Sequence, residues 1–426
     1  MAFLSPNDKI DKLSYMISDS QQIYRIRYKF LYACTLFFMM CSLYNMSFTW
    51  MFPRPIVCAA SCLVSLFFFL VNSRYFALNK KEKIMVALLC MWHFFLVFAS
   101  PNVLGAFIFQ TIYAIVAVIL ISSPICMKKY MFNLISLFTT IILTISLAGW
   151  ILYLLGYPLR SYFVTEFDDN YHVLENYYFF LVNVNSQFDI PRFCSMFLEP
   201  GQMASPVLLL LMSNLILNGR KFDIAIQSAS IFFSFSLAGW VIGIIAFLAY
   251  FIIKHKSQKW LILGFFMAFV ATCTIAINRL SEDSAITRLI IDRLVYNEET
   301  GIEGNNRTDT SFDSQFEKYI SSEKALWGIS EELRTKSDWT EGNSGFKLII
   351  VHYGFIGFAI LLALLLVICL SYKSTYGLIV FFSFFVLGGI RNFWGNLFWL
   401  YIILYALPVI KHETISTIHK VSGNTH

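Results

Sequence analysis

The stretch VLGAFIFQTIYAIVAVILISSPI, residues 103–125, decides the fold class, because no charged side chain interrupts it. A helix rises about 1.5 Å per residue and the hydrocarbon core of a bilayer is about 30 Å thick, so about 20 apolar residues can cross it. This stretch therefore predicts a membrane-spanning helix.

The composition extends that prediction to the whole chain. Hydrophobic residues make up 58% of the 426 positions and charged residues only 14%, whereas a soluble chain carries about 25% charged residues. Such a chain cannot cover its surface with polar groups, so a water-soluble fold is excluded. We predict an all-α integral membrane protein.

Further apolar runs on both sides of residues 103–125 predict the remaining helices. The single runs are 30–52, 55–72, 84–100, 131–153, 202–217, 260–278 and 346–370. Two longer runs, 224–253 and 377–410, exceed one crossing and are expected to fold back. The reversals are expected at the small residues Ser234, Ser236, Ala238 and Gly239 and at the polar group 391–396. About twelve crossings result, although each half of a long run is short enough to be re-entrant.

The distribution of Lys and Arg orients the chain, because cytoplasmic loops retain these residues. Placing both termini in the cytoplasm puts most of the 32 Lys and Arg residues inside, while the outer segments hold more Asp and Glu than Lys and Arg. The expected order is a cytoplasmic tail 1–24, transmembrane helices in 25–153, an outer loop 154–201, transmembrane helices in 202–278, a larger outer loop 279–345, transmembrane helices in 346–410 and a cytoplasmic tail 411–426. Function is expected in the two long outer loops.

Neither the nine cysteines nor the net charge of +6 indicates another class of protein. Only Cys194 lies outside the apolar runs, and no C-x-x-C pair occurs, so we expect packing cysteines, no disulfide framework, no metal and no cofactor. The longest basic cluster, residues 80–83, adjoins an apolar run. Membrane topology explains the positive charge better than a nucleic-acid partner, which is not expected.

The most informative outer segment is PRFCSMFLEPGQMA, residues 191–204. Proline favours the first helical position, so a span is expected to begin at Pro200 with Glu199 just outside. A helix N-terminus favours an anion, and Arg192 adds a permanently charged donor, so the corner suits a phosphate. Alternatively, Arg192 reaches toward lipid headgroups and Glu199 caps the helix. Free N–H groups are expected at Gly201, Gln202 and Met203.

Four motifs resemble the O-antigen polymerase (Wzy) and O-antigen ligase superfamily of bacterial envelope enzymes. They are R-x-x-x-x-F-x-E-P from Arg192 to Pro200, SLAGW at 236–240, GNSGFKL at 342–348 and HYGFIG at 352–357. The resemblance covers most of residues 130–405, by layout more than by dense identity. It implies an inner-membrane glycosyltransferase whose outer loops are periplasmic and which uses neither a nucleotide sugar nor a metal.

The reaction implied by this resemblance is polymerisation. A glycan would move from undecaprenyl diphosphate to the terminal sugar of an incoming lipid-linked repeat unit, at the periplasmic face. Arg192 would stabilise the departing diphosphate. Besides the lipid-linked oligosaccharide and the bilayer, a protein that regulates chain length is an expected partner.

A sugar hydroxyl also needs a general base, and the outer half of the chain offers Glu199 and His352. Glu199 is favoured, because a lone histidine inside a span is more often a packed residue. The remaining candidate contacts to diphosphate or glycan are Arg160, Gly201, Gln202, Arg307, Asn343 and Arg391. Arg307 lies among turn-forming residues and matches a functional arginine that the superfamily carries in this loop, although a solvated charge is the alternative. Arg391 either lines the cavity or anchors the last outer turn.

Two other functions stay open. A ligase would transfer finished polymer to another acceptor, but ligases of the superfamily carry a histidine near the end of the large loop, and none occurs between His172 and His352. A flippase for the lipid-linked oligosaccharide would need charged residues deep in many helices. The apolar runs are poor in them, which favours an enzyme over a transporter.

Overall fold

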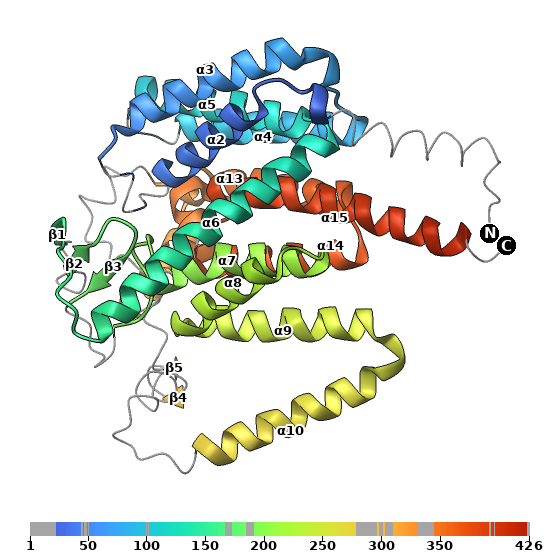
Figure 1. Ribbon diagram of the computed structural model, residues 1–426. Coiled ribbons are helices and arrows are strands. Elements are labelled where there is room, and N and C mark those ends of the chain that lie inside the picture. The colour runs from blue at the N-terminus through green and yellow to red at the C-terminus, as the bar shows by residue number, and fades with distance from the viewer. Residues whose placement is uncertain are drawn as a thin grey trace.

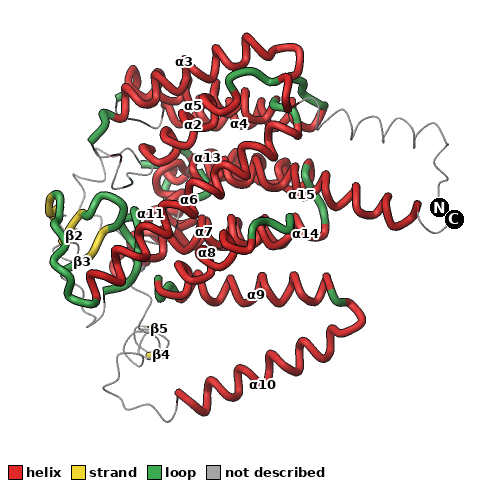
Figure 2. Tube along the Cα trace, in the orientation of Figure 1, coloured by secondary structure: helices red, strands yellow, loops and turns green. Residues whose placement is uncertain are grey.

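The computed structural model is built almost entirely of helices, with a few short strands at one end (Figures 1 and 2). The structure describes residues 23–43, 46, 49, 51–98, 100, 102–166, 173–184, 191–277, 296–297, 301–302, 310–329, 345–391, 393–395 and 397–423. Arg307 and Asn343 lie outside the described residues.

Every predicted apolar run contains a helix. Those in the first part of the chain are α2 (Lys29–Leu43), α3 (Arg54–Asn72), α4 (Lys80–Phe98), α5 (Val103–Ser122) and α6 (Ile125–Leu154). Those in the second part are α7 (Pro200–Ile216), α8 (Lys221–Phe233), α9 (Leu237–Lys254), α10 (Lys259–Ile277), α13 (Gly345–Ser371), α14 (Thr375–Arg391) and α15 (Leu397–Gly423). The two long runs fold back where the sequence predicted, between α8 and α9 and between α14 and α15.

Six of the helices in the described residues are long and apolar enough to cross a bilayer. They are α3 with the short turn η2 (Ser73–Tyr75), α5, α6, α9, α13 and the first part of α15. Helices α2, α7 and α14 are apolar but shorter, and α8, with 13 residues, extends only about 20 Å. The chain is therefore a helical membrane protein.

The helix ends differ from the expected run ends where charged residues join a helix. Helix α4 begins at Lys80 and α6 begins after Pro124, so Lys128 and Lys129, expected in an inner loop, are helical. Lys128 is buried and pairs with Glu82 at 3.2 Å. Helix α15 likewise continues past residue 410 into the expected tail.

Short elements lie in the long loops. The sequence predicts an amphipathic helix there, around Ile286, Leu289, Ile290 and Leu294, which lies outside the described residues. Strands β1 (Phe163–Glu166), β2 (Val173–Asn176) and β3 (Leu181–Asn183) form an antiparallel sheet, and β4 (Tyr296–Asn297) pairs with β5 (Gly301–Ile302). Helix α11 (Thr310–Ile320) and the turn η5 (Glu323–Leu326) follow, while the turn η3 (Lys256–Gln258) joins α9 to α10.

Helices α7 and α15 form the centre of the bundle. Nearly all side chains of α7 are buried, and so is every residue of α15 from Leu397 to Ile410. Helix α15 packs against α2, α5, α6, α7 and α14. A helix that is apolar on all sides can be buried in this way without leaving polar side chains unsatisfied.

The described parts of both long loops lie at the same end of the bundle, which we call the loop end. The sheet β1–β3, the start of α7, the turn between α8 and α9 and the end of α14 lie there, whereas α15 runs out at the opposite end (Figure 1). The segments that the sequence grouped as outer therefore share one end of the molecule.

Candidate functional site

The first turn of α7 forms the corner that the sequence singled out. Helix α7 begins at Pro200, and Glu199 precedes it with extended backbone, φ −133° and ψ 147°, as predicted. The Glu199 carbonyl accepts from the N–H groups of Gln202 and Met203, at 3.1 and 3.2 Å. These two N–H groups were expected to be free, so the prediction of an open N-terminus was wrong for both.

The Glu199 carboxylate pairs with Arg391, the last residue of α14, instead of capping α7. Arg391 donates from Nη1 to Glu199 Oε2 at 2.7 Å, across 192 positions of sequence. The side chain of Arg391 is 13% exposed and that of Glu199 is 36% exposed. Such partial burial weakens screening by water, so the pair is stronger than an exposed one.

A glycine allows the Arg391 guanidinium to lie directly on the first turn of α7. A Cβ added to Gly201 would come within 1.8 Å of Arg391 Nη2. Arg391 Nε is buried and has no hydrogen-bond partner among the described residues. A buried donor without an acceptor is costly, so an anion placed there would be favoured.

The start of α13 closes the same corner. A Cβ on Gly345 would come within 1.8 Å of the carbonyl oxygen of Gly389, in the last turn of α14. The N-termini of α7 and α13 therefore both lie close to the end of α14. The C-terminus of α14 carries a partial negative charge that offsets part of their positive charge, so the Arg391 guanidinium is the main cation of the corner and Glu199 is the counter-charge in contact with it.

Arg192 makes two hydrogen bonds that the sequence did not predict. Its Nε donates to the Ser234 carbonyl at 3.0 Å and its Nη2 donates to the Phe235 carbonyl at 2.9 Å. Both carbonyls belong to the turn between α8 and α9, where Phe235 has a φ of 46°. Arg192 thus attaches the loop before α7 to this turn.

The charges of both Arg192 and Glu199 act on the thiol of Cys194. Burial raises the pKa of the Cys194 thiol to about 12, while the Arg192 charge lowers that pKa and the Glu199 charge raises it. The thiol also donates to the Leu181 carbonyl at 3.2 Å. Cys194 is therefore protonated at neutral pH and packs as a buried residue instead of acting as a nucleophile.

His352 lies in α13, about 10 Å along the helix axis from Gly345. Its ring is half-buried and meets the ring of Tyr353 edge to face at 5.8 Å between centroids. Its carbonyl oxygen faces Gly328, where a Cβ would approach within 2.4 Å. His352 thus sits beside the segment that follows α11.

Arg160 is exposed, in the segment between α6 and β1.

The structure brings Glu199, Gly201 and Arg391 together at the N-terminus of α7, with Gln202 in the same turn. The sequence did not predict that Arg391 pairs with Glu199, because 192 positions separate the two residues. Gly201 was the signal that something lies closely against the first turn.

Within the described ranges, no three His, Cys, Asp or Glu side chains gather as metal ligands would. No family model, curated protein or solved structure matches the chain. The resemblance to O-antigen polymerases and ligases therefore stays a prediction carried by the sequence motifs.

Proposed function

We propose that this protein is a membrane-embedded glycosyltransferase that polymerises lipid-linked repeat units of a bacterial surface polysaccharide. The observation that carries this proposal is the Arg391–Glu199 pair resting on the first turn of α7. It combines, at the loop end of an apolar bundle, a guanidinium, a helix N-terminus and a carboxylate. In glycosyl transfer from a diphosphate, the first two can bind the leaving diphosphate and the carboxylate can accept the proton of the acceptor hydroxyl.

The cationic side of the corner suits the leaving group. Charge accumulates on the phosphate oxygen as the bond to the anomeric carbon breaks, because the electron pair of that bond stays on oxygen. Arg391 has five N–H donors and uses Nη1 on Glu199, so its other donors can face phosphate oxygens. Arg391 is therefore assigned the diphosphate contact that the sequence prediction gave to Arg192.

The carboxylate suits the acceptor. The hydroxyl oxygen of the terminal sugar bonds to the anomeric carbon, and its proton passes to Glu199. Pairing with Arg391 keeps Glu199 ionised before substrate binds. Once diphosphate occupies the guanidinium, that pairing weakens and Glu199 becomes a better proton acceptor.

The proposed setting is the periplasmic face of the inner membrane, with about twelve crossings and both termini in the cytoplasm. The common position of the long loops at one end supports this arrangement. The substrate is undecaprenyl-diphosphate-linked oligosaccharide. Arg160, Arg307 and Asn343 in the loops, with His352, stay candidate contacts to glycan.

Purified protein and a synthetic diphospholipid glycan test the proposal. We expect Arg391→Ala and Glu199→Gln each to lower chain extension at least about a hundredfold, as loss of one charged catalytic group does. Arg74→Ala is the matched control, because Arg74 is an exposed arginine at the opposite end, stacked on Tyr75. Extension at the wild-type rate by folded Arg391→Ala protein would refute the assignment.

Cells carrying the same variants separate the alternatives. Loss of a polymerase leaves single repeats on the carrier lipid, whereas loss of a ligase leaves finished polymer on it. If purified protein scrambles the lipid across vesicles without extending it, the protein is a transporter. The variant Arg192→Ala needs a thermal-stability measurement beside it, because Arg192 also holds the turn between α8 and α9.

A further inference from the structure

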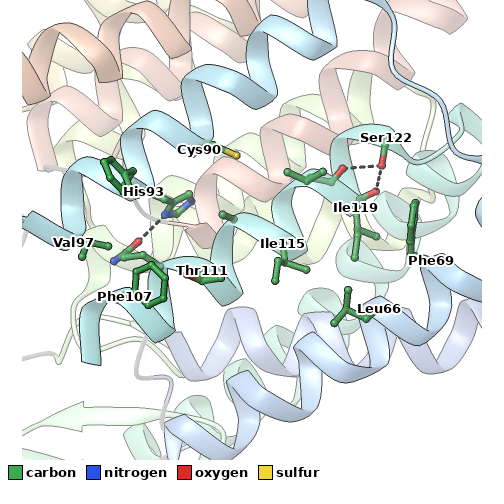
Figure 3. Close-up of a pocket in the computed structure, with 14 residues that line it drawn as sticks. Leu66, Phe69, Cys90, His93, Val97, Phe107, Thr111, Ile115, Ile119 and Ser122 are labelled. Atoms are coloured by element: carbon green, nitrogen blue, oxygen red, sulfur yellow. Dashed lines mark hydrogen bonds between the residues drawn. The ribbon is translucent and has the colours of Figure 1, made fainter. Parts of the chain in front are cut away.

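A cavity of about 380 Å³ lies between α3, α4 and α5, away from the site described above (Figure 3). Its walls are almost entirely apolar, with Leu66 and Phe69 from α3, Phe94 from α4 and Ile115 from α5. Along α5 the lining runs from Phe107 to Ser122, which corresponds to about 22 Å. The cavity is therefore an elongated groove, parallel to helices that can span a membrane.

The groove opens where the bilayer would be. Leu66, Phe94 and Phe107 on its walls are exposed, with Phe94 60% exposed. Helices α3 and α5 each qualify as membrane spans, so these side chains face hydrocarbon and not water. The occupant that can enter from this side has an apolar chain.

Besides the hydroxyl groups of Thr111 and Ser122, a hydrogen-bonded polar pair interrupts the apolar walls. His93 of α4 and Gln110 of α5 both line the groove, and His93 Nδ1 lies 2.6 Å from Gln110 Oε1 (Figure 3). His93 is only 3% exposed, and its Nε2 has no hydrogen-bond partner in the part of the chain that the structure describes. The groove thus holds a buried polar atom that a ligand can satisfy.

The bond to Gln110 determines what Nε2 requires. A carboxamide oxygen only accepts hydrogen bonds, so the proton must be on Nδ1. A neutral imidazole carries one proton, and its Nε2 is then an acceptor with a free lone pair. A hydroxyl group satisfies it, whereas an ether or ester oxygen cannot.

We propose that this groove binds a long-chain lipid alcohol, with its hydrocarbon chain along α5 and its hydroxyl donating to His93 Nε2. The shared chemistry is an apolar chain with a hydroxyl-bearing head, which either an isoprenoid alcohol or a monoacylglycerol supplies. The groove has no charged side chain among its lining residues, so the ligand is neutral at this position. The site is independent of the glycosyltransferase proposal.

Photolabelling of the purified full-length protein in lipid nanodiscs tests the proposal. The probes are a diazirine-bearing farnesol, a diazirine-bearing monoacylglycerol, and the derivative of each in which every hydroxyl is converted to a methyl ether. We expect at least one alcohol to label peptides of α3, α4 and α5 roughly threefold to tenfold more than its ether, as one hydrogen bond allows. The probe with the higher ratio of alcohol labelling to ether labelling shows whether the ligand is an isoprenoid alcohol or an acylglycerol.

Three variants assign the effect to the groove. Ala114→Phe fills the groove and should remove labelling by every probe, and His93→Phe should bring the alcohol-to-ether ratio to about one. Gln110→Leu should also lower this ratio while leaving His93 in place, because it frees Nδ1 and lets the ring present an N–H to an ether. Size-exclusion profiles establish that each variant is folded. Equal labelling by alcohol and ether in the wild type, or labelling that Ala114→Phe leaves unchanged, would overturn the proposal.

Discussion

Ile329 donates its backbone N–H to the carbonyl oxygen of Val351, 2.8 Å away, from a segment outside the bundle to the middle of a helix. In an unbroken helix this carbonyl would accept from Phe355. Gly354 interrupts α13 with φ 64° and ψ −179°, which turns the following residues away. The segment after α11 therefore completes the hydrogen bonding of a broken helix, and the break is what fixes that segment over α13.

Gly354→Ala tests the break directly. Alanine at φ 64° is strained, and its Cβ would lie 2.3 Å from the Leu326 carbonyl oxygen. We expect a loss of about 1–3 kcal/mol in the free energy of unfolding and faster amide hydrogen exchange in residues 310–329. Gly264→Ala is the control, because nothing lies within 4 Å of a Cβ there, and it should be neutral or stabilising by up to about 1 kcal/mol. An unchanged melting temperature for Gly354→Ala would contradict this account.

Tyr319 ties α11 to the same break, and its removal should appear in the pH dependence of stability. Its hydroxyl donates to the Ile350 carbonyl at 3.1 Å, and burial raises its pKa from 10.0 to about 12. A raised folded-state pKa contributes stability that is complete below pH 10 and is lost as the pH rises through about 12.

We therefore expect Tyr319→Phe to cost about 1 kcal/mol at pH 7 and to make the loss of stability above pH 10 less steep than in the wild type. Thermal unfolding between pH 7 and pH 12 measures both. Ser321→Ala, which removes an exposed hydroxyl bonded to Glu317, should leave the pH profile unchanged. Parallel profiles for Tyr319→Phe and wild type above pH 10 would show that Tyr319 is not the group responsible.

Local sequence signals predicted the helices well. Pro200 set the start of α7, and the small residues at 234–236 and the polar group after Arg391 set the two fold-backs. These features act within a few residues, through proline geometry and hydrophobic length.

Features that depend on distant partners were not predictable in the same way. Gly354 breaks α13 because the backbone of Leu326 approaches it, and nothing in a continuous apolar run reveals that approach. Arg391 was expected at the loop end, but its choice of Glu199 depends on how α7 and α14 pack. The amphipathic helix α11, which packs against α13 and η5, was also missed.

Gly201→Ala should disable the candidate site while leaving α7 intact. Alanine favours a helix by about 1 kcal/mol over glycine, so α7 itself gains. The added Cβ, however, would stand 1.8 Å from Arg391 Nη2 and must displace the guanidinium. We expect glycan extension to fall at least about tenfold, as misplacement of a catalytic group by an ångström allows.

Double-mutant cycles give the matching energetic test. The cycle measures the free energy of unfolding. We expect the coupling free energy between Glu199→Gln and Arg391→Gln to be about 1–3 kcal/mol in the wild-type background and near zero when Gly201 is alanine. An undiminished coupling energy in the alanine background would mean that the guanidinium keeps its place on Glu199 despite the added methyl group.

The buried pair at the opposite end of the bundle predicts the largest loss of stability. Lys128 pairs with Glu82 at 3.2 Å, with side chains 4% and 11% exposed, and Tyr372 also donates to Glu82. Removing Lys128 leaves the Glu82 charge uncompensated, so Lys128→Met should cost about 3–5 kcal/mol. Replacing both residues, as Lys128→Met with Glu82→Gln, should recover most of that loss, because no buried charge remains.

The adjacent lysine supplies the control for this pair. Lys129 bonds to Glu413 at 2.5 Å, with side chains 54% and 38% exposed, so Lys129→Met should change stability by no more than about 1 kcal/mol. Apparent free energies of unfolding in mixed micelles compare the variants. Equal losses for Lys128→Met and Lys129→Met would show that burial does not distinguish the two pairs, and that Glu82 reaches water when its partner is removed.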